Sequence, residues 1–228
     1  IPGVELFFLV FKNNAAIVKV LSLVPAENII TVDYGSPGRL LASGLRAMRR
    51  LLREGIDTTI DMDFFSRLTA LIAFFACRGN RVGFHRYNDE GSYRGNLLTH
   101  RVAYSPHVHT SAAFIALVRT LFEKPDDEPY YRGRIDPKDL ILPHYTPAPQ
   151  DVKSVREKLA AAGVSKSQNG PIVLINPNSS DIFPLRKWPL PYFAELCQSL
   201  LQELPACRLV VTGVAAEQAD ARYILEYV

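Results

Sequence analysis

Hydroxyl and cationic side chains gather just beyond an apolar run at residues 172–175. The run ends in a polar turn that contains Ser179 and Ser180, and the basic pair Arg186 and Lys187 follows. In open α/β sheets, ligands bind at the carboxyl edge of the strands, where such a turn would lie. Hydroxyls, loop N–H groups and fixed cations are the groups that hold a diphosphate. The spacing therefore predicts a phosphate-binding site, although a helix cap and two solvated cations explain the same residues equally well.

An acidic residue follows the next apolar run. Residues 208–212 are mostly apolar, Gly213 comes directly after them, and Glu217 lies four residues later. An acid just past a strand end can bind ribose hydroxyls, but a helix N-terminus also favours an acid through its macrodipole. The chain contains neither GxGxxG nor GxxxxGK[ST]. Both a dinucleotide-binding Rossmann site and a P-loop are therefore disfavoured.

A second charged group lies in the first half of the chain. Asp61 and Asp63 stand at the end of a predicted strand, residues 57–62, and Arg67 lies in the predicted helix beyond it. A cleft could use these side chains to hold a charged ligand, whereas N-capping by either aspartate is the structural alternative. We interpret Asp61 as structural and Arg67 as functional.

Other catalytic chemistry has little support in the sequence. His107 and His109 have the spacing of a metal pair, but no Cys or carboxylate partner has suitable spacing, so we expect no metal site. His109 precedes a predicted helix, which it would cap or pack against. There is no GxSxG elbow and no Ser-His-Asp order. The three cysteines, Cys77, Cys197 and Cys207, predict free buried thiols in a reducing compartment.

The elements that must position these residues alternate between strand and helix. We predict strands at residues 4–11, 29–33, 57–62, 81–84 and 97–104, and helices at residues 15–24, 39–54, 65–76 and 110–122. Ser36-Pro37 would begin the helix at 39–54 and Gly55 would end it. The helix at 65–76 is apolar on most faces, which predicts that it is well buried. This alternation predicts βαβ units and a parallel sheet.

The pattern breaks at residues 123–149, which contain six prolines and many charges and are typical of a linker. A helix at 152–162 and the strand–loop–helix–strand unit follow. The predicted fold is therefore α/β, with one domain at residues 1–145 and a second, incomplete domain at residues 146–228.

Composition narrows the classes of protein. The net charge is only +3 and 48% of residues are hydrophobic, which excludes a chain that is disordered over most of its length. Basic residues cluster on one predicted helix at Arg46, Arg49, Arg50 and Arg53. This favours an anionic small molecule or a membrane surface over nucleic acid as partner. No signal peptide is present and the apolar run at 68–77 is too short to span a bilayer, so we expect a soluble, cytoplasmic protein.

Two stretches together resemble glycosyltransferase family 9, the heptosyltransferases of lipopolysaccharide synthesis. The first covers residues 57 to about 122, with DTTIDMDFFSRLTALIAF, NRVGF and LLTHRV before His109 opens a helix. The second is the NPNSS…RKWP…VVTGVAAE unit. The resemblance implies a GT-B architecture of two Rossmann-like domains facing across a cleft. The N-terminal domain would hold the acceptor and the C-terminal domain the sugar nucleotide, often ADP-heptose.

The resemblance also implies roles for residues. Ser179 and Ser180 match a hydroxyl pair that contacts the donor phosphates, and Glu217 matches an acid that contacts the nucleoside. Arg186 matches a Lys two residues before the Trp that grips the diphosphate, and the adjacent Lys187 could serve instead. On the acceptor side, Arg67 matches a basic residue that meets an anionic acceptor, with Asp63 and Arg86 assigned to the same site. Transfer would be inverting and metal-independent, with a nucleotide sugar as substrate and no cofactor.

The implied partners are a nucleotide-sugar donor and an anionic glycolipid acceptor of the lipopolysaccharide-core type, with peripheral contact at the cytoplasmic face of the inner membrane. Two interpretations stay open beside transfer. One is a degenerate sugar-nucleotide-binding module without catalysis. The other is a different GT-B enzyme, such as a nucleotide-sugar epimerase.

The sequence also departs from the family pattern. The family opens with a strand and a Gly-Asp loop whose Asp acts as general base, whereas residues 4–11 look like the family's second strand. The family's Asp-Thr-Gly-x-x-His stretch has no counterpart here. We therefore expect a fragment that lacks the first strand and part of the donor site. Because loss of a general base typically removes ~10²–10⁴ in rate, we expect this chain alone to be inactive.

Overall fold

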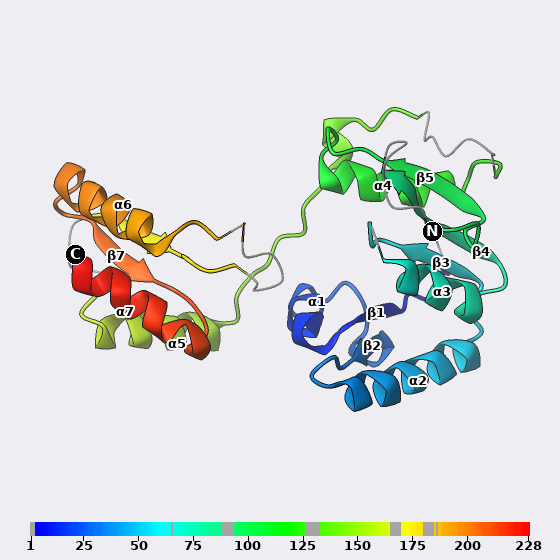
Figure 1. The fold of residues 1–228 in the computed structure, drawn as a ribbon, viewed down its shortest axis with the longest axis horizontal. Coiled ribbons are helices and arrows are strands. Elements are labelled where there is room, and N and C mark those ends of the chain that lie inside the picture. Colours follow the sequence, from blue (N-terminus) through cyan, green and yellow to red (C-terminus); the bar gives the residue numbers. More distant parts are fainter. Residues whose placement is uncertain are drawn as a thin grey trace. The chain divides into compact units, whose positions relative to one another are not determined.

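The computed structural model describes residues 3–64, 66–87, 94–125, 133–164, 170–179, 185 and 187–228, and of Arg86 and Tyr87 it describes the backbone alone. The chain divides into two compact units, Ile1–Tyr145 and Thr146–Val228, which run from blue to green and from yellow-green to red in Figure 1. Within the described residues no helix has both the length and the apolarity needed to cross a membrane.

The first unit alternates strands and helices (Figure 1). Its strands are β1 (Phe8–Phe11), β2 (Ile29–Val32), β3 (Thr58–Asp61), β4 (Asn80–Tyr87) and β5 (His100–Tyr104). Its helices are α1 (Ala15–Leu21), α2 (Pro37–Glu54), α3 (Arg67–Ala76) and α4 (Thr110–Thr120). All strand pairs are parallel, as the sequence predicts. The described strands form two sheets, however, ordered β1-β2 and β3-β4-β5.

Several boundaries differ from the prediction because backbone pairing, and not apolarity, defines a strand. The strand predicted at residues 4–11 is paired from Phe8 onward, and the one predicted at 97–104 is paired from His100 onward. β4 instead continues three residues past its predicted end. The helix predicted at 15–24 ends at Leu21, because Ser22 adopts a left-handed conformation with φ 51°.

Local sequence signals determine both ends of α2. Ser36 Oγ accepts a hydrogen bond from the Arg39 N–H at 3.3 Å, and Pro37 occupies the first turn. Gly55 ends the helix at φ 66°, a left-handed conformation that glycine adopts without a steric penalty. The cap and the end predicted for this helix are confirmed.

Three hydrophobic clusters stabilise the described part of the first unit, and the smallest consists of Ala15, Val24 and Ile29 around α1 and β2. One of the two larger clusters joins β2, α2 and α3 through Ile30, Val32, Ala47, Leu51 and Ala76, with β1 side chains packed against it. The other joins β4, β5 and α4 through Val82, Phe84, Val102, Ala113 and Leu117. Helix α3 packs against β3 and contributes to the cluster around β2 and α2, so the same helical layer serves the two sheets.

The prediction that α3 is buried on most faces is wrong. Ala70, Ala73 and Ala76 are buried, whereas Leu68 and Phe75 are 58% and 62% exposed. Small alanine side chains let a helix lie close against its neighbours, so the alanine face turns inward. The larger apolar side chains of Leu68 and Phe75 therefore face solvent in the described part of the unit.

The second unit is smaller. It consists of α5 (Pro149–Ala161), β6 (Ile172–Ile175), α6 (Leu190–Glu203), β7 (Arg208–Val211) and α7 (Gln218–Tyr227). β6 and β7 pair in parallel, from Ile172 opposite Arg208 to Ile175 opposite Val211. Ile175, Cys197 and Ile224 form its core, and α6 packs against α7.

The three cysteines are free and buried, as predicted. Burial raises the pKa of the Cys197 thiol, and the nearby Cys207 raises it further. Because the thiolate is the reactive form, Cys197 is a core residue with low reactivity.

Candidate functional site

The turn after β6 places Ser179 at the carboxyl end of that strand. Within the turn, Asn176 Oδ1 accepts a hydrogen bond from the Asn178 N–H at 3.2 Å, and Pro177 is buried. Ser179 Oγ is shielded from solvent and has no hydrogen-bond partner among the described residues. A buried hydroxyl without a partner is unfavourable. An incoming ligand oxygen would satisfy it.

The ends of β6 and β7 come together at Gly213. Pairing continues past β7, since the Thr212 N–H donates to Ile175 O at 2.8 Å. A Cβ on Gly213 would lie 2.7 Å from Glu217 Oε2 and 3.8 Å from Asn178 Nδ2. A side chain at position 213 would therefore displace the Glu217 carboxylate from this turn. Asn178, from the turn after β6, and Gly213 and Glu217, from the segment after β7, thus share one edge of the sheet.

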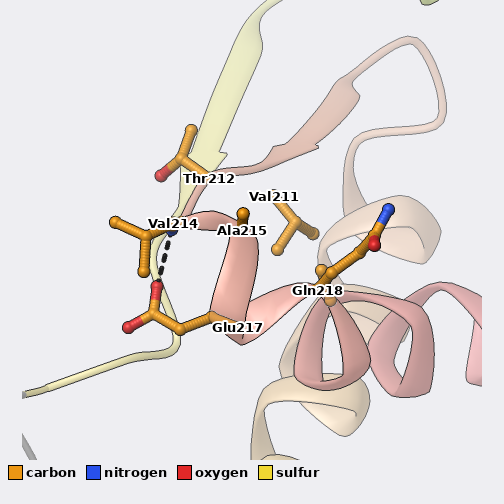
Figure 2. A pocket seen from close by; sticks show the side chains of 8 residues that line it. Val211, Thr212, Val214, Ala215, Glu217 and Gln218 are labelled. Atoms are coloured by element: carbon orange, nitrogen blue, oxygen red, sulfur yellow. Dashed lines mark hydrogen bonds between the residues drawn. The ribbon is translucent and has the colours of Figure 1, made fainter.

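A pocket of about 280 Å³ lies beyond the end of β7 (Figure 2). Its lining comes from the strand end, the following turn and the start of α7: Val211, Thr212, Gly213, Val214, Ala215, Glu217, Gln218 and Ala221. Thr212, Glu217 and Gln218 supply its polar side-chain groups, and the valines and alanines supply its apolar surface.

Glu217 performs the capping role that the sequence left open. Figure 2 shows its side chain turned back to the Val214 backbone, whose N–H donates to Oε2 at 2.8 Å. Its other oxygen, Oε1, has no hydrogen-bond partner in the described part of the chain. One carboxylate oxygen therefore stabilises the turn before α7, and the other is free to meet a ligand hydroxyl.

Lys187 is held at the start of α7. Its Nζ donates to Asp220 Oδ2 at 2.6 Å, and both side chains are about two-thirds buried. Asp220 lies three residues after Glu217, so the cation and the acid predicted for the donor are anchored to the same helix. A phosphate that reached Lys187 would compete with Asp220. The other two predicted donor residues, Ser180 and Arg186, lie outside the described residues.

Two predicted acceptor residues lie where β3 leads into α3, Asp63 in the loop and Arg67 as the first residue of the helix. Asp63 and Arg67 are both exposed. Asp63 Oδ1 accepts a hydrogen bond from the Ser66 N–H at 2.7 Å, and Ser66 itself caps α3 by accepting from the Thr69 N–H at 3.3 Å. N-capping by an aspartate, the structural alternative for this segment, is therefore wrong. The side chain of Arg86, the third predicted acceptor residue, lies outside the described residues.

Asp61 has a structural role, as predicted, but as one member of an ion pair and not as a helix cap. Its carboxylate binds Arg94, and both side chains are at least 95% buried. Arg94 escapes prediction from the sequence because the two residues are 33 positions apart and no local motif links them. One indirect signal is present: Gly83 lies opposite Asp61 in the β3–β4 pairing, and a Cβ there would lie 3.2 Å from Asp61 Cβ.

A further polar cluster lies where β1 and β2 end. Lys12 Nζ lies 3.3 Å from Asp33 Oδ2, and the Gly35 N–H donates to Asp33 Oδ1 at 2.9 Å. The Gly35 hydrogen bond, followed by that from Lys12, holds the pKa of Asp33 below its usual value. These groups satisfy one another, and we assign them no ligand.

His109 has a structural role. His109 Nδ1 accepts a hydrogen bond from the Ser111 N–H at 3.2 Å and so caps α4, which confirms the structural role predicted for it. Across the described ranges, no three His, Cys, Asp or Glu residues lie close enough to hold a metal ion.

No protein-family model matches this sequence, and no curated protein matches it either. Solved structures do resemble it. The heptosyltransferase WaaC of E. coli with ADP-2-deoxy-2-fluoro heptose matches 99% of this chain and 65% of its own, with a TM-score of 0.56 and 15% identity. The same enzyme with ADP matches 99% of this chain and 64% of its own, with a TM-score of 0.57 and 15% identity. A glycosyl transferase family 9 structure from Veillonella parvula matches 97% of this chain and 57% of its own, with a TM-score of 0.62 and 14% identity.

This likeness shows the fold. The chain is α/β with parallel sheets that match part of the GT-B glycosyltransferase structures, as the sequence resemblance implied. It spans less than two thirds of the length of each of these structures.

Proposed function

We propose that this chain is part of an inverting, metal-independent glycosyltransferase. It would move a sugar, with heptose as the leading candidate, from a nucleotide diphosphate donor to an acceptor of the lipopolysaccharide-core type. Residues 146–228 would form part of a Rossmann-like donor domain, and residues 1–145 a Rossmann-like acceptor domain. The fold likeness to WaaC structures that contain ADP or an ADP-heptose analogue supports this assignment.

The observation that carries the proposal is the unpartnered hydroxyl of Ser179. Its Oγ is buried at the carboxyl end of β6. The preceding residue, Asn178, lies close to Gly213, and Gly213 lies close to Glu217. A phosphate oxygen of the donor would accept a hydrogen bond from this hydroxyl. Glu217 Oε1 would accept from a ribose hydroxyl in the neighbouring pocket. One ligand that has both a phosphate and a ribose satisfies both groups.

The charges fit the departure of a nucleoside diphosphate. In an inverting transfer, the acceptor oxygen bonds to the anomeric carbon from one side while the bond to the diphosphate breaks on the other. The leaving diphosphate takes the electron pair, so fixed cations near it lower the barrier. Lys187 and Arg186 are the cations proposed for this role, together with Ser180 as a second hydroxyl. We assign no general base to this chain.

The acceptor would bind at the β3–α3 loop. Arg67, with Arg86, would hold its anionic group, and Asp63 would accept from a sugar hydroxyl. The exposed arginines of α2, Arg46, Arg49 and Arg53, would favour a negatively charged membrane surface that presents a glycolipid. We therefore propose that the protein works in the cytoplasm, at the inner face of the membrane.

The two sheets of the first unit suggest where a further strand belongs. Among the described strands, β1 pairs with β2 alone and β3 with β4 alone, so each has one unpaired parallel edge. Unpaired edges are unfavourable unless covered. We propose that one more parallel strand fits between β1 and β3 and completes the acceptor domain.

Isothermal titration with ADP-, UDP- and GDP-sugars tests the donor site. We expect an ADP-sugar to bind most tightly, and Ser179→Ala to weaken it about tenfold, since one hydrogen bond to a charged group is lost. Ser199→Ala is the matched control, because its hydroxyl bonds Glu195 O at 2.9 Å within α6. Arg186→Ala should weaken binding as well. Absence of binding to every sugar nucleotide, or unchanged affinity in Ser179→Ala, would contradict the proposal.

The same donor site would also serve a sugar-nucleotide-binding module without catalysis, or another GT-B enzyme such as a nucleotide-sugar epimerase. Incubating the full-length protein that contains this chain with the donor, with and without a lipopolysaccharide-core acceptor, separates these functions. Transfer needs the acceptor, epimerisation proceeds without it, and a binding module returns the donor unchanged.

A further inference from the structure

Arg94 is a buried arginine with a full set of hydrogen bonds. It is 2% exposed, and its guanidinium uses all five of its N–H donors. Two donors bind side chains: Nη2 binds the Asp61 carboxylate and, at 2.7 Å, Thr69 Oγ1. The remaining three bind backbone carbonyls, those of Ser66 at 2.9 Å, Asp63 at 2.8 Å and Phe84 at 3.0 Å.

These partners define what Arg94 holds together. Asp61 and Phe84 lie at or near the carboxyl ends of β3 and β4, Asp63 and Ser66 lie in the β3–α3 loop (residues 62–66), and Thr69 lies in the first turn of α3. Asp61 adds to this arrangement, because its Oδ1 accepts from the Asp63 N–H at 3.1 Å. One buried cation thus fixes the loop to two strands and one helix.

A buried guanidinium is costly unless it is paired and fully hydrogen-bonded. Arg94 meets that condition only in this loop conformation, since three of its bonds go to carbonyls and side chains of residues 63–69. Any rearrangement of the loop would leave a buried charge short of partners. The pair therefore strongly favours a single loop geometry over alternatives.

We propose that Arg94 is the positioning residue of the acceptor site. It does not touch the acceptor; it holds the β3–α3 loop so that the exposed Asp63 and Arg67 meet an anionic sugar acceptor in a fixed geometry. This inference rests on the proposed function and adds a residue to it. Misplacing a binding group by about 1 Å lowers activity up to about 100-fold, which is the size of effect that Arg94 prevents.

Arg81, near the start of β4, provides a matched control. Its Nε donates to Leu97 O at 2.7 Å and its Nη1 to Cys77 O at 3.2 Å and Gly79 O at 3.0 Å. It therefore also binds backbone carbonyls, but near the start of β4, at the opposite edge of the sheet from Asp63 and Arg67. A change at Arg81 tests loss of stability without disturbing the β3–α3 loop.

The test compares Arg94→Lys with Arg81→Lys, because lysine keeps the charge but cannot fill five directed bonds. Thr69→Val is a milder variant that removes one Arg94 bond, should Arg94→Lys not fold. The measurements are thermal stability, affinity for a deacylated lipopolysaccharide-core oligosaccharide, and affinity for an ADP-sugar. We expect Arg94→Lys to weaken oligosaccharide binding about 10- to 100-fold and Thr69→Val to weaken it less, while both keep ADP-sugar affinity within about twofold. Arg81→Lys should lose stability and keep both affinities.

Two results would overturn the proposal in distinguishable ways. If the unaltered protein binds the oligosaccharide and Arg94→Lys binds it equally well, or if Arg81→Lys weakens it as much as Arg94→Lys does, Arg94 is not a positioning residue and the proposed function stands. If Arg94→Lys does not fold, unchanged binding by Thr69→Val likewise excludes the positioning role. If the unaltered protein does not bind the oligosaccharide, the acceptor class and the role of Arg94 both fail.

Discussion

At the residue scale, single side chains combine a structural bond with an open bonding site. Glu217 binds the Val214 N–H through Oε2 and has no described partner at Oε1. Ser179 is its counterpart across the turn, with a buried hydroxyl that the described residues do not satisfy. Folding alone accounts for the first bond, whereas the proposed donor, with its hydroxyl and phosphate groups, would account for the rest.

Glutamine at position 217 separates the two roles. In Glu217→Gln the amide oxygen can still accept from Val214, so we expect the free energy of unfolding to change by less than about 0.5 kcal/mol. Donor affinity should fall about tenfold, because a charge-assisted hydrogen bond to ribose becomes neutral. Chemical denaturation and calorimetric titration measure the two quantities. Glu217→Ala should lose both, and unchanged affinity in Glu217→Gln would leave Glu217 with the cap alone.

At the element scale, close backbone approach and caps position the strands and helices. Gly79 precedes β4, and a Cβ there would lie 2.1 Å from Asp57 O, beside the start of β3. The Asn80 N–H bonds that same carbonyl at 2.9 Å. The β3–β4 pairing therefore begins where the backbones are too close for a side chain at position 79. The pairing that starts there sets the register in which the two strands reach their carboxyl ends.

Two glycine substitutions test this constraint, one at Gly79, where the backbones approach closely, and one at Gly44, where an added Cβ has open space. Gly79→Ala should lower the free energy of unfolding by about 1–3 kcal/mol, because a backbone carbonyl cannot move aside without breaking the pairing. Gly44→Ala should instead raise it by about 0.5–1 kcal/mol, since Gly44 lies inside α2 and an added Cβ meets nothing within 4 Å. Urea unfolding measures both. Equal effects of the two substitutions would show that the close approach at Gly79 is not a constraint.

At the scale of the whole molecule, the chain consists of two compact units joined by an extended segment. Residues 141–148 are exposed and form neither helix nor strand. Each unit has its own buried side chains, which among the described residues form three clusters in the first unit and one around Ile175 in the second. The units therefore have separate sources of stability.

Limited proteolysis tests this division. We expect a stable fragment to end between residues 141 and 148, because these residues are exposed and form neither helix nor strand. Mass spectrometry of the fragments after brief chymotrypsin treatment locates the cuts. Persistence of a protected fragment that includes β5 and β6 together would argue against two independently stable units.

The pH dependence of stability should carry a signature of His100. Burial holds the pKa of His100 below its ordinary value, against an opposing hydrogen bond to the Glu123 backbone. The unfolded chain therefore takes up a proton at higher pH than the folded protein does, so stability is lost as the pH falls below about 6.5. One such proton contributes at most about 1.4 kcal/mol per pH unit.

Urea unfolding at pH 7.5 and pH 5.5 measures this contribution. His100→Gln should lose less stability between the two pH values than the unaltered protein does. The exposed His144 provides the control, and His144→Gln should behave like the unaltered protein. Identical pH dependence in all three proteins would exclude His100 as the source.

The sequence by itself determined what depends on neighbours along the chain. Ser36, Pro37 and Gly55 are enough to place both ends of α2, and alternating apolar runs are enough to predict parallel α/β units, because caps, turns and periodicity act over a few residues. It also singled out the turn at Ser179 and the acid Glu217, since hydroxyls and an acid beyond strand ends have a recognisable chemistry.

Only the tertiary structure decided what depends on distant contacts. Three such contacts are present: Asp61 pairs with Arg94, Glu217 lies close to Gly213 beside Asn178, and Asp220 binds Lys187. They join residues up to 39 positions apart in the sequence, which is the separation of Asn178 and Glu217. The exposure of Leu68 and Phe75 likewise follows from which face of α3 its alanines bring against the sheet. Such contacts depend on how helices and strands pack, and packing is a property of the assembled fold that no local pattern encodes.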